Sequence, residues 1–165
     1  MMVSTHFPLV RDHYYLKHPK IIEEITFEGH TFLSKYERVD DYLSDDLIAR
    51  HQARKITIAT SIPSDAQYLL FDYNGKEQAL FYHKMAKVLR QQGIDTFIAY
   101  ESKTPLHLHL YLYCGEISAP QREELGKIIS DNLEKKLQKQ WRIFPNPALP
   151  EAYNIINLPY DIFKG

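Results

Sequence analysis

The most constraining feature of this 165-residue chain is the alternating run Leu-His-Leu-His-Leu-Tyr-Leu-Tyr-Cys at residues 106–114. Successive side chains of a β-strand point to opposite faces, so the leucines share one face of this segment. The other face carries His107, His109, Tyr111 and Tyr113. A row of leucines must lie against helices, whereas the histidine face must point away from that core. The segment therefore predicts one strand of a sheet that helices cover on one side.

The neighbouring segments predict a regular order of strands and helices. The predicted strands cover residues 55–61, 67–72, 96–101, 106–114 and 153–158, and the predicted helices cover residues 77–92 and a segment from about residue 118. From residue 67 onward this order is strand-helix-strand-strand-helix-strand, the ferredoxin-like or split βαβ pattern. We therefore predict an α+β fold with an antiparallel sheet and helices on one face. The three prolines after Trp141 predict a rigid loop.

The N-terminal part of the chain is less regular. Residues 6–43 are aromatic and mixed in charge, which favours short strands or hairpins, and Ser44 is a good N-cap for a helix at about 44–53. The chain is 44% hydrophobic, enough for a packed core, and its length suits one domain. We expect a single domain over residues 1–165, in which an extension at 1–45 packs on a core at 47–160.

Charge and hydropathy restrict the partners. Lys plus Arg is 20 and Asp plus Glu is 21, which gives a formal net charge of −1. Proteins that bind a long duplex through its phosphates usually carry an excess of basic residues. Nucleic acid is therefore a possible but not a favoured partner, whereas binding of a single nucleotide needs no such excess. The chain has neither a signal-peptide pattern nor an apolar run of membrane-spanning length. We expect a cytoplasmic protein with no membrane partner.

Asp72 and Asn74 form the first candidate site. They are two residues apart at the end of an apolar strand, so both side chains lie on one face. Two oxygen ligands there suit Mg²⁺, with water and phosphate oxygens completing its shell. The alternative is that Asp72-Tyr73-Asn74-Gly75 only ends a strand and caps the next helix.

His107 and His109 form the second candidate site. Two histidines at i and i+2 suit a transition metal or hydrogen bonds to phosphate, but they also suit an ordinary polar sheet face. In a split βαβ sheet, the strand that ends at Asp72 and the strand that starts at His107 can be neighbours. We therefore expect Asp72 and His107 to lie on adjacent strands and to face the same cleft.

Five short motifs follow one another between residues 47 and 160. They are LIARHQARKITIAT at 47–60, LLFDYNG at 69–75, a helix ending near Gly93, IAYESKTPLHLHLYL at 98–112, and RIFPNPALPEAYNIINLPY at 142–160. In this order they resemble the catalytic module of the archaeo-eukaryotic primase (prim-pol) superfamily. The first 45 residues resemble an uncharacterised domain of small proteins from Helicobacter-type bacteria, which implies no function.

The resemblance assigns roles to three residues. In the superfamily the acids of the first motif bind two metal ions, a serine and a histidine hold the triphosphate of a nucleotide, and a further acid completes the metal site. By position, Asp72 matches the first acid, Ser102 the serine and His107 the histidine.

The sequence also departs from that pattern. Asn74 stands where the second acid is expected, no third acid lies near residues 142–146, and Lys103-Thr104-Pro105 replaces the usual glycines. Backbone amides next to a proline wrap a phosphate less freely, and Lys103 offers a point charge in their place. Two-metal polymerisation needs several carboxylates, so template-directed synthesis is not expected.

We therefore expect a degenerate prim-pol site that binds a nucleotide, specifically a purine triphosphate, with Mg²⁺ at Asp72 and Asn74. The predicted phosphate contacts are Ser102, Lys103, His107 and His109. One alternative is an active primase, polymerase or nucleotidyltransferase, with a missing acid supplied by a residue such as Asp161; nucleotide hydrolysis lies between these two. Another is a non-catalytic scaffold, which an aromatic plug from the N-terminal segment over the site would favour.

Overall fold

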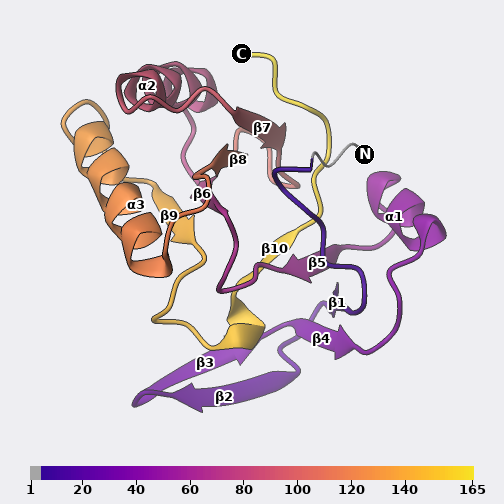
Figure 1. The fold of residues 1–165 in the computed structure, drawn as a ribbon. Helices are drawn as coiled ribbons and strands as arrows, with labels where there is room; N and C mark the ends of the chain where they lie inside the picture. The colour runs from indigo at the N-terminus through magenta and orange to yellow at the C-terminus, as the bar shows by residue number, and fades with distance from the viewer. Residues whose placement is uncertain (1–4) are drawn as a thin grey trace. The chain divides into compact units, whose positions relative to one another are not determined.

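The computed structural model describes residues 5–165, which divide into two compact units (Figure 1). The first unit contains the residues up to Pro8, Ser64–Pro145 and Pro159–Gly165, and the second contains Leu9–Pro63 and Asn146–Leu158. Each unit has an antiparallel sheet, so the predicted α+β class is confirmed. The prediction of one domain with an extension over residues 1–45 stays a prediction.

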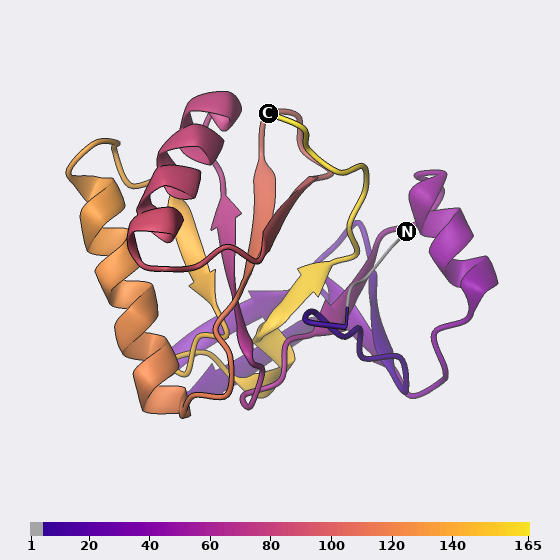
Figure 2. The same cartoon turned by 45° about the horizontal axis from the view of Figure 1, so that its top comes forward.

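The sheet of the first unit has the predicted ferredoxin-like topology. Its elements are β6 (Tyr68–Tyr73), α2 (Gln78–Gln91), β7 (Phe97–Glu101), β8 (Leu108–Tyr113), α3 (Ala119–Glu134) and β9 (Trp141–Phe144). The strand order is β7-β8-β6-β9, with every neighbouring pair antiparallel. The two helices lie side by side on one face of this sheet (Figures 1 and 2).

The alternation of β8 determines which face the helices cover. Leu108, Leu110 and Leu112 are completely buried and pack with residues of α2 and α3. The start of α3 is fixed by a capping box, in which the Ser118 hydroxyl accepts from Gln121 N and the Gln121 side chain accepts from Ser118 N. The histidine face of β8 is the face opposite to the helices, as the sequence predicts.

The fourth strand of this sheet corrects the sequence prediction. It is β9, which pairs with β6. The sequence instead predicts a loop after Trp141 and a fourth strand at 153–158. The prolines begin only at Pro145, directly after β9 ends. The predicted late strand is β10 (Ile155–Asn157), and it pairs with β5 in the second unit. Ile143 and Phe144 are both apolar, so this four-residue strand lacks the strict alternation that would have indicated it.

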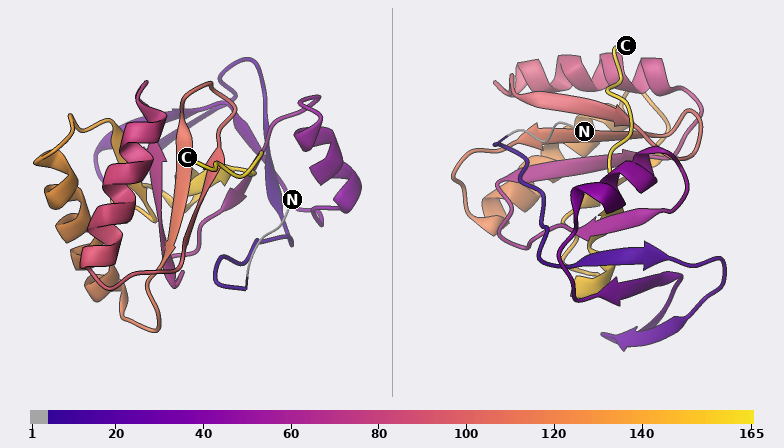
Figure 3. Two further views of the ribbon diagram at one scale, coloured as in Figure 1. Left: turned by 90° about the horizontal axis from the view of Figure 1, so that it is seen from above. Right: turned by 90° about the vertical axis from the view of Figure 1, so that its right-hand side faces the viewer.

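The second unit contains the short strands predicted for the N-terminal part. Its sheet has the order β10-β5-β1-β4, with β1 at Tyr14–Lys17, β4 at Tyr36–Val39 and β5 at Ile58–Ser61. The hairpin of β2 (Glu23–Phe27) and β3 (His30–Ser34) forms a separate two-stranded sheet (Figure 3). Its turn residues Glu28 and Gly29 both have positive φ, as a type I′ turn requires. A 3₁₀ helix covers Glu151–Tyr153.

Helix α1 (Asp45–Gln52) begins and ends with specific side-chain contacts. At its start, the Ser44 hydroxyl accepts a hydrogen bond from Leu47 N at 3.2 Å, which confirms the predicted cap. At its end, the fully buried His51 accepts from Ile58 N at its Nδ1 atom and donates from Nε2 to the Leu158 carbonyl, both at 3.0 Å. One imidazole therefore forms hydrogen bonds with two main-chain groups, one at the start of β5 and one directly after β10.

We predict that His51→Leu destabilises the protein by about 3 kcal/mol, because it leaves a buried N–H and a buried carbonyl without their imidazole partner. The control is His30→Leu, which changes an exposed histidine of β3 and should alter stability by less than about 0.5 kcal/mol. Urea unfolding followed by circular dichroism measures both. Equal stability of the two variants would contradict the bridging role of His51.

Candidate functional site

A row of four polar side chains crosses the face of the first unit's sheet that is opposite to the helices. The strand registers place Tyr100 of β7 opposite His109 of β8, His109 opposite Asp72 of β6, and Asp72 opposite Arg142 of β9. Side chains that are directly opposite in antiparallel strands lie close together on one face. The four residues, which we call the charged row, come from four strands and span the whole width of the sheet.

Asp72 is the centre of the charged row. Its carboxylate is 6% exposed, with Oδ1 at 3.3 Å from Nε2 of the equally buried His109. The other oxygen, Oδ2, accepts a hydrogen bond from a terminal nitrogen of Arg142 at 2.8 Å. The Arg142 side chain is 67% exposed and passes over the ring of Phe144, 5.5 Å from its centroid. A buried anion thus anchors a guanidinium that remains accessible to solvent.

These contacts lower the pKa of Asp72. Burial on its own would raise that pKa, because a carboxylate loses hydration inside the protein. Hydrogen bonds and charge attraction from His109 and Arg142 outweigh burial, so the net direction is downward. Asp72 is therefore ionised near neutral pH and holds its two basic partners in place.

The other end of the same sheet face is covered by aromatic rings. Phe7 packs against Tyr68 and Tyr111 with ring centroids 5.9 and 5.6 Å apart, and His6 lies 4.4 Å from the ring of Tyr113. Burial raises the pKa of Tyr68 to about 12 and that of Tyr111 well above its ordinary value, so both hydroxyls stay neutral. The aromatic plug that the sequence considered is present. By register, the two tyrosines that Phe7 contacts lie four residues (Tyr68) and two residues (Tyr111) along the sheet from the pair of Asp72 and His109.

The β7–β8 loop lies at the same end of the sheet as the charged row. It contains the half-buried Ser102, the exposed Lys103 and the half-buried His107. The His107 carbonyl accepts from Ser102 N at 3.4 Å and from the Gln78 side chain at 3.2 Å. The structure gives the contact with Asp72 to His109, on a strand adjacent to β6 as expected, whereas His107 precedes that strand. The phosphate roles of these residues stay predictions.

The predicted magnesium ligands do not fit a Mg²⁺ ion in this arrangement. Both oxygens of Asp72 already face basic groups, and the Asn74 side chain donates to the main-chain carbonyl of Asp72 at 3.3 Å. Between residues 5 and 165, no three His, Cys, Asp or Glu side chains are grouped as a metal site requires. Magnesium at Asp72 and Asn74 stays a prediction, and no chemical step is assigned to it.

Arg142 is the residue of the charged row that sequence reasoning missed. It lies in the segment for which the sequence favoured a loop, and its alternation with the apolar Trp141 and Ile143 is the only local signal of its position. Its partner, Asp72, is 70 residues away in the sequence. A contact over that distance becomes visible only when β9 is paired with β6.

Comparisons with known proteins give limited matches. Residues 5–68 match the family model described as "Domain of unknown function (DUF1882)". Among curated proteins, none matches this chain. A solved structure to which it is similar is the polymerase domain of Mycobacterium tuberculosis ligase D in complex with DNA, with a TM-score of 0.46 and 17% sequence identity. That match covers 77% of this chain and 56% of the polymerase-domain chain, so this chain spans little more than half of it.

Among residues 5–165, none of the helices combines the length and the apolar character required to cross a bilayer.

We predict that Asp72→Asn lowers stability by about 2 kcal/mol near pH 7, because it removes a buried charge from its two basic partners. Since folding lowers the pKa of Asp72, its contribution is present above the unfolded pKa and is lost as the pH falls through the folded one. The difference between wild type and variant should therefore persist above about pH 5 and shrink below about pH 4.

Denaturant unfolding between pH 3 and 7 measures this dependence. The control is Asp131→Asn on α3, where an exposed aspartate should contribute less than about 0.5 kcal/mol at any of these pH values. A stability loss for Asp72→Asn that does not change with pH would contradict the lowered pKa of Asp72.

Proposed function

We propose that the charged row binds the phosphates of a nucleoside triphosphate, with a purine base, and that the protein does so without template-directed synthesis. The observation that carries this proposal is the geometry of Arg142, whose exposed guanidinium is held by the buried carboxylate of Asp72 at 2.8 Å. A guanidinium has five N–H donors in a planar fork, and one bond to Asp72 leaves others for a ligand. Phosphate oxygens match that fork.

Fixing Arg142 in advance lowers the cost of binding. A free arginine side chain has large rotamer entropy, which a ligand must otherwise restrict. Here Asp72 holds the head group and Phe144 lies beneath it, so part of that restriction is already present. Asp72 acts in this proposal as a positioning residue, and Arg142 is the residue that contacts phosphate.

The β7–β8 loop supplies further phosphate partners in this proposal. Glu101 and Leu108 are paired at the ends of their strands, one residue beyond the pair of Tyr100 and His109, so the loop starts next to the charged row. Lys103 is exposed on that loop and contributes a positive charge. The Ser102 hydroxyl and the His107 imidazole are further donors for the remaining phosphate oxygens.

The absence of synthesis in this proposal follows from the number and spacing of carboxylates. Two-metal catalysis places ions about 4 Å apart between shared acids. Asp161, the acid considered as a replacement, pairs through its carbonyl with Glu101 N, on the far side of β7 from β8. With strands about 4.8 Å apart, three spacings separate its main chain from β6, or about 14 Å. That distance does not favour the alternative of an active primase or polymerase.

A non-catalytic scaffold is the second candidate, and the aromatic plug favours it. His6 and Phe7 cover Tyr68, Tyr111 and Tyr113 on the face opposite to the helices, and Phe7 is only 6% exposed. Such a cover reduces the area that a base can stack on. It leaves the exposed guanidinium of Arg142, beside Asp72 at the end of β6, for phosphate groups.

We predict that a purine nucleoside triphosphate binds more tightly than the matching nucleoside, and that Arg142→Ala weakens triphosphate binding about tenfold or more. Binding should survive removal of Mg²⁺ with EDTA, because Asp72 is paired with basic groups. Titration calorimetry measures the affinity of the wild type for each ligand, with and without Mg²⁺, and the affinity of Arg142→Ala for the triphosphate. The matched control is Arg90→Ala, which removes an exposed arginine at the end of α2 and should leave binding unchanged.

Two results would decide against this proposal. Equal affinity for nucleoside and triphosphate would remove the phosphate role of the charged row. If neither ligand binds to the folded protein, with or without Mg²⁺, the scaffold remains as the supported function.

We also predict that the protein extends no primer and makes none. A primer–template assay with Mg²⁺ or Mn²⁺ should give the same background for wild type and Asp72→Ala. Incorporation by the wild type that the variant loses would show that Asp72 serves a metal and would support the alternative of an active polymerase.

A further inference from the structure

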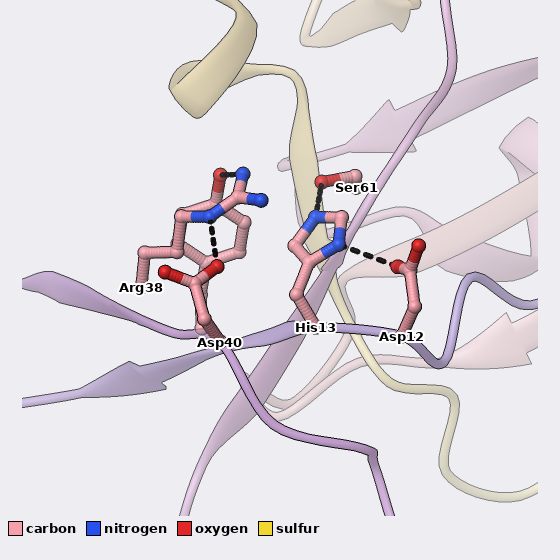
Figure 4. Close-up of polar contacts among 6 residues, drawn as sticks. Asp12, His13, Arg38, Asp40 and Ser61 are labelled. Carbon is pink, nitrogen blue, oxygen red and sulfur yellow. Dashed lines mark hydrogen bonds and ion pairs between the residues drawn. The ribbon is translucent and has the colours of Figure 1, made fainter.

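The second unit contains a separate group of polar side chains centred on His13 (Figure 4). Its Nδ1 atom lies 2.6 Å from Oδ1 of Asp12, and its Nε2 atom lies 2.8 Å from the hydroxyl of Ser61. The His13 side chain is 15% exposed and the Asp12 side chain is 85% exposed, whereas Ser61 is half-buried. We call these three residues the Ser61 group.

The fold of the second unit brings the Ser61 group together. Tyr15 of β1 pairs with Ala59 of β5, so His13, two residues earlier, and Ser61, two residues later, lie opposite one another. Asp12 is adjacent to His13 in the sequence and reaches the other nitrogen of the ring. The contact between His13 and Ser61 joins residues 48 positions apart and depends on the strand pairing.

Asp12 is the carboxylate that orients His13. The register of β1 and β4 also brings Asp40 toward His13, because Tyr14 pairs with Val39. Asp40, however, accepts a hydrogen bond from Nε of Arg38 at 2.7 Å and is occupied by that arginine (Figure 4). The Asp12 contact fixes the tautomer that has a proton on Nδ1 and a lone pair on Nε2.

We propose that Ser61 is a nucleophile for acyl transfer, with His13 as its general base and Asp12 as the positioning residue. A serine hydroxyl is a weak nucleophile unless an adjacent base removes its proton. The Ser61 group has the required order of contacts, since hydroxyl, Nε2, Nδ1 and carboxylate follow one another within hydrogen-bond distance. The substrate class is a carboxylic ester with a small acyl group, because Ser61 is half-buried.

The proposed reaction needs only the Ser61 group, the ester and a water molecule. The Oγ atom of Ser61 attacks the ester carbonyl carbon while its proton moves to Nε2 of His13, which gives a tetrahedral adduct. The bond from that carbon to the alcohol oxygen then breaks, and the departing oxygen takes the proton from His13. A water molecule repeats the two steps on the acyl-serine, releases the carboxylic acid and restores Ser61.

The test uses the full chain and two probes that report a reactive serine. A fluorophosphonate should form a covalent adduct that mass spectrometry locates on Ser61, and p-nitrophenyl acetate should release p-nitrophenol. Ser61→Ala should abolish both signals. The matched control Ser64→Ala removes an exposed hydroxyl three residues away and should change neither. His13→Ala should slow labelling about 100-fold, the usual contribution of a general base.

Two further variants separate chemistry from structure. Added imidazole should restore part of the labelling of His13→Ala, which a merely structural histidine would not allow. Asp12→Asn should slow labelling, and Asp12→Glu should retain more of it because a carboxylate remains. No adduct on Ser61 of the folded wild type would overturn the proposal, and so would labelling of Ser61 that does not change in His13→Ala.

Discussion

The buried carboxylate of Asp72 is the constraint on which the arrangement of the first unit's sheet face opposite to the helices depends. A charge that is 6% exposed is costly unless charged or hydrogen-bonding groups surround it, and here one partner comes from each neighbouring strand. His109 on β8 and Arg142 on β9 therefore have defined positions. The leucine face of β8, on the other side of the sheet, holds the strands against α2 and α3 and so fixes the register that aligns the three residues.

The two units carry different kinds of chemistry. The first unit has a cation, Arg142, that is held in place by a buried anion, which suits recognition of an anionic ligand. The second unit has a hydroxyl, Ser61, next to an oriented imidazole, which suits reaction with an electrophile. Neither group includes a residue of the other unit, so each proposal stands or fails independently.

Much of the fold could be predicted from the sequence, but the partners in its sites could not. Alternation in β8 and helical spacing in α2 and α3 are local patterns, so they identified the face opposite to the helices and the candidate His109. Asp72 was recognised as the acid at the end of an apolar strand. Strand β9 has four residues followed by Pro145, which gave too little pattern to place Arg142. The contact of His13 with Ser61 is set by strand pairing between distant segments, and pairing has no local signature.

The most direct test of the charged row is an NMR titration of side-chain nitrogens with a purine nucleoside triphosphate. The Nε–H signal of Arg142 and the imidazole signals of His109 should shift together and saturate at one ligand concentration. The buried His51, which belongs to the other unit, should keep its shifts. Unchanged Arg142 and His109 signals at saturating triphosphate, or shifts confined to the second unit, would contradict the assignment of this row as the ligand site.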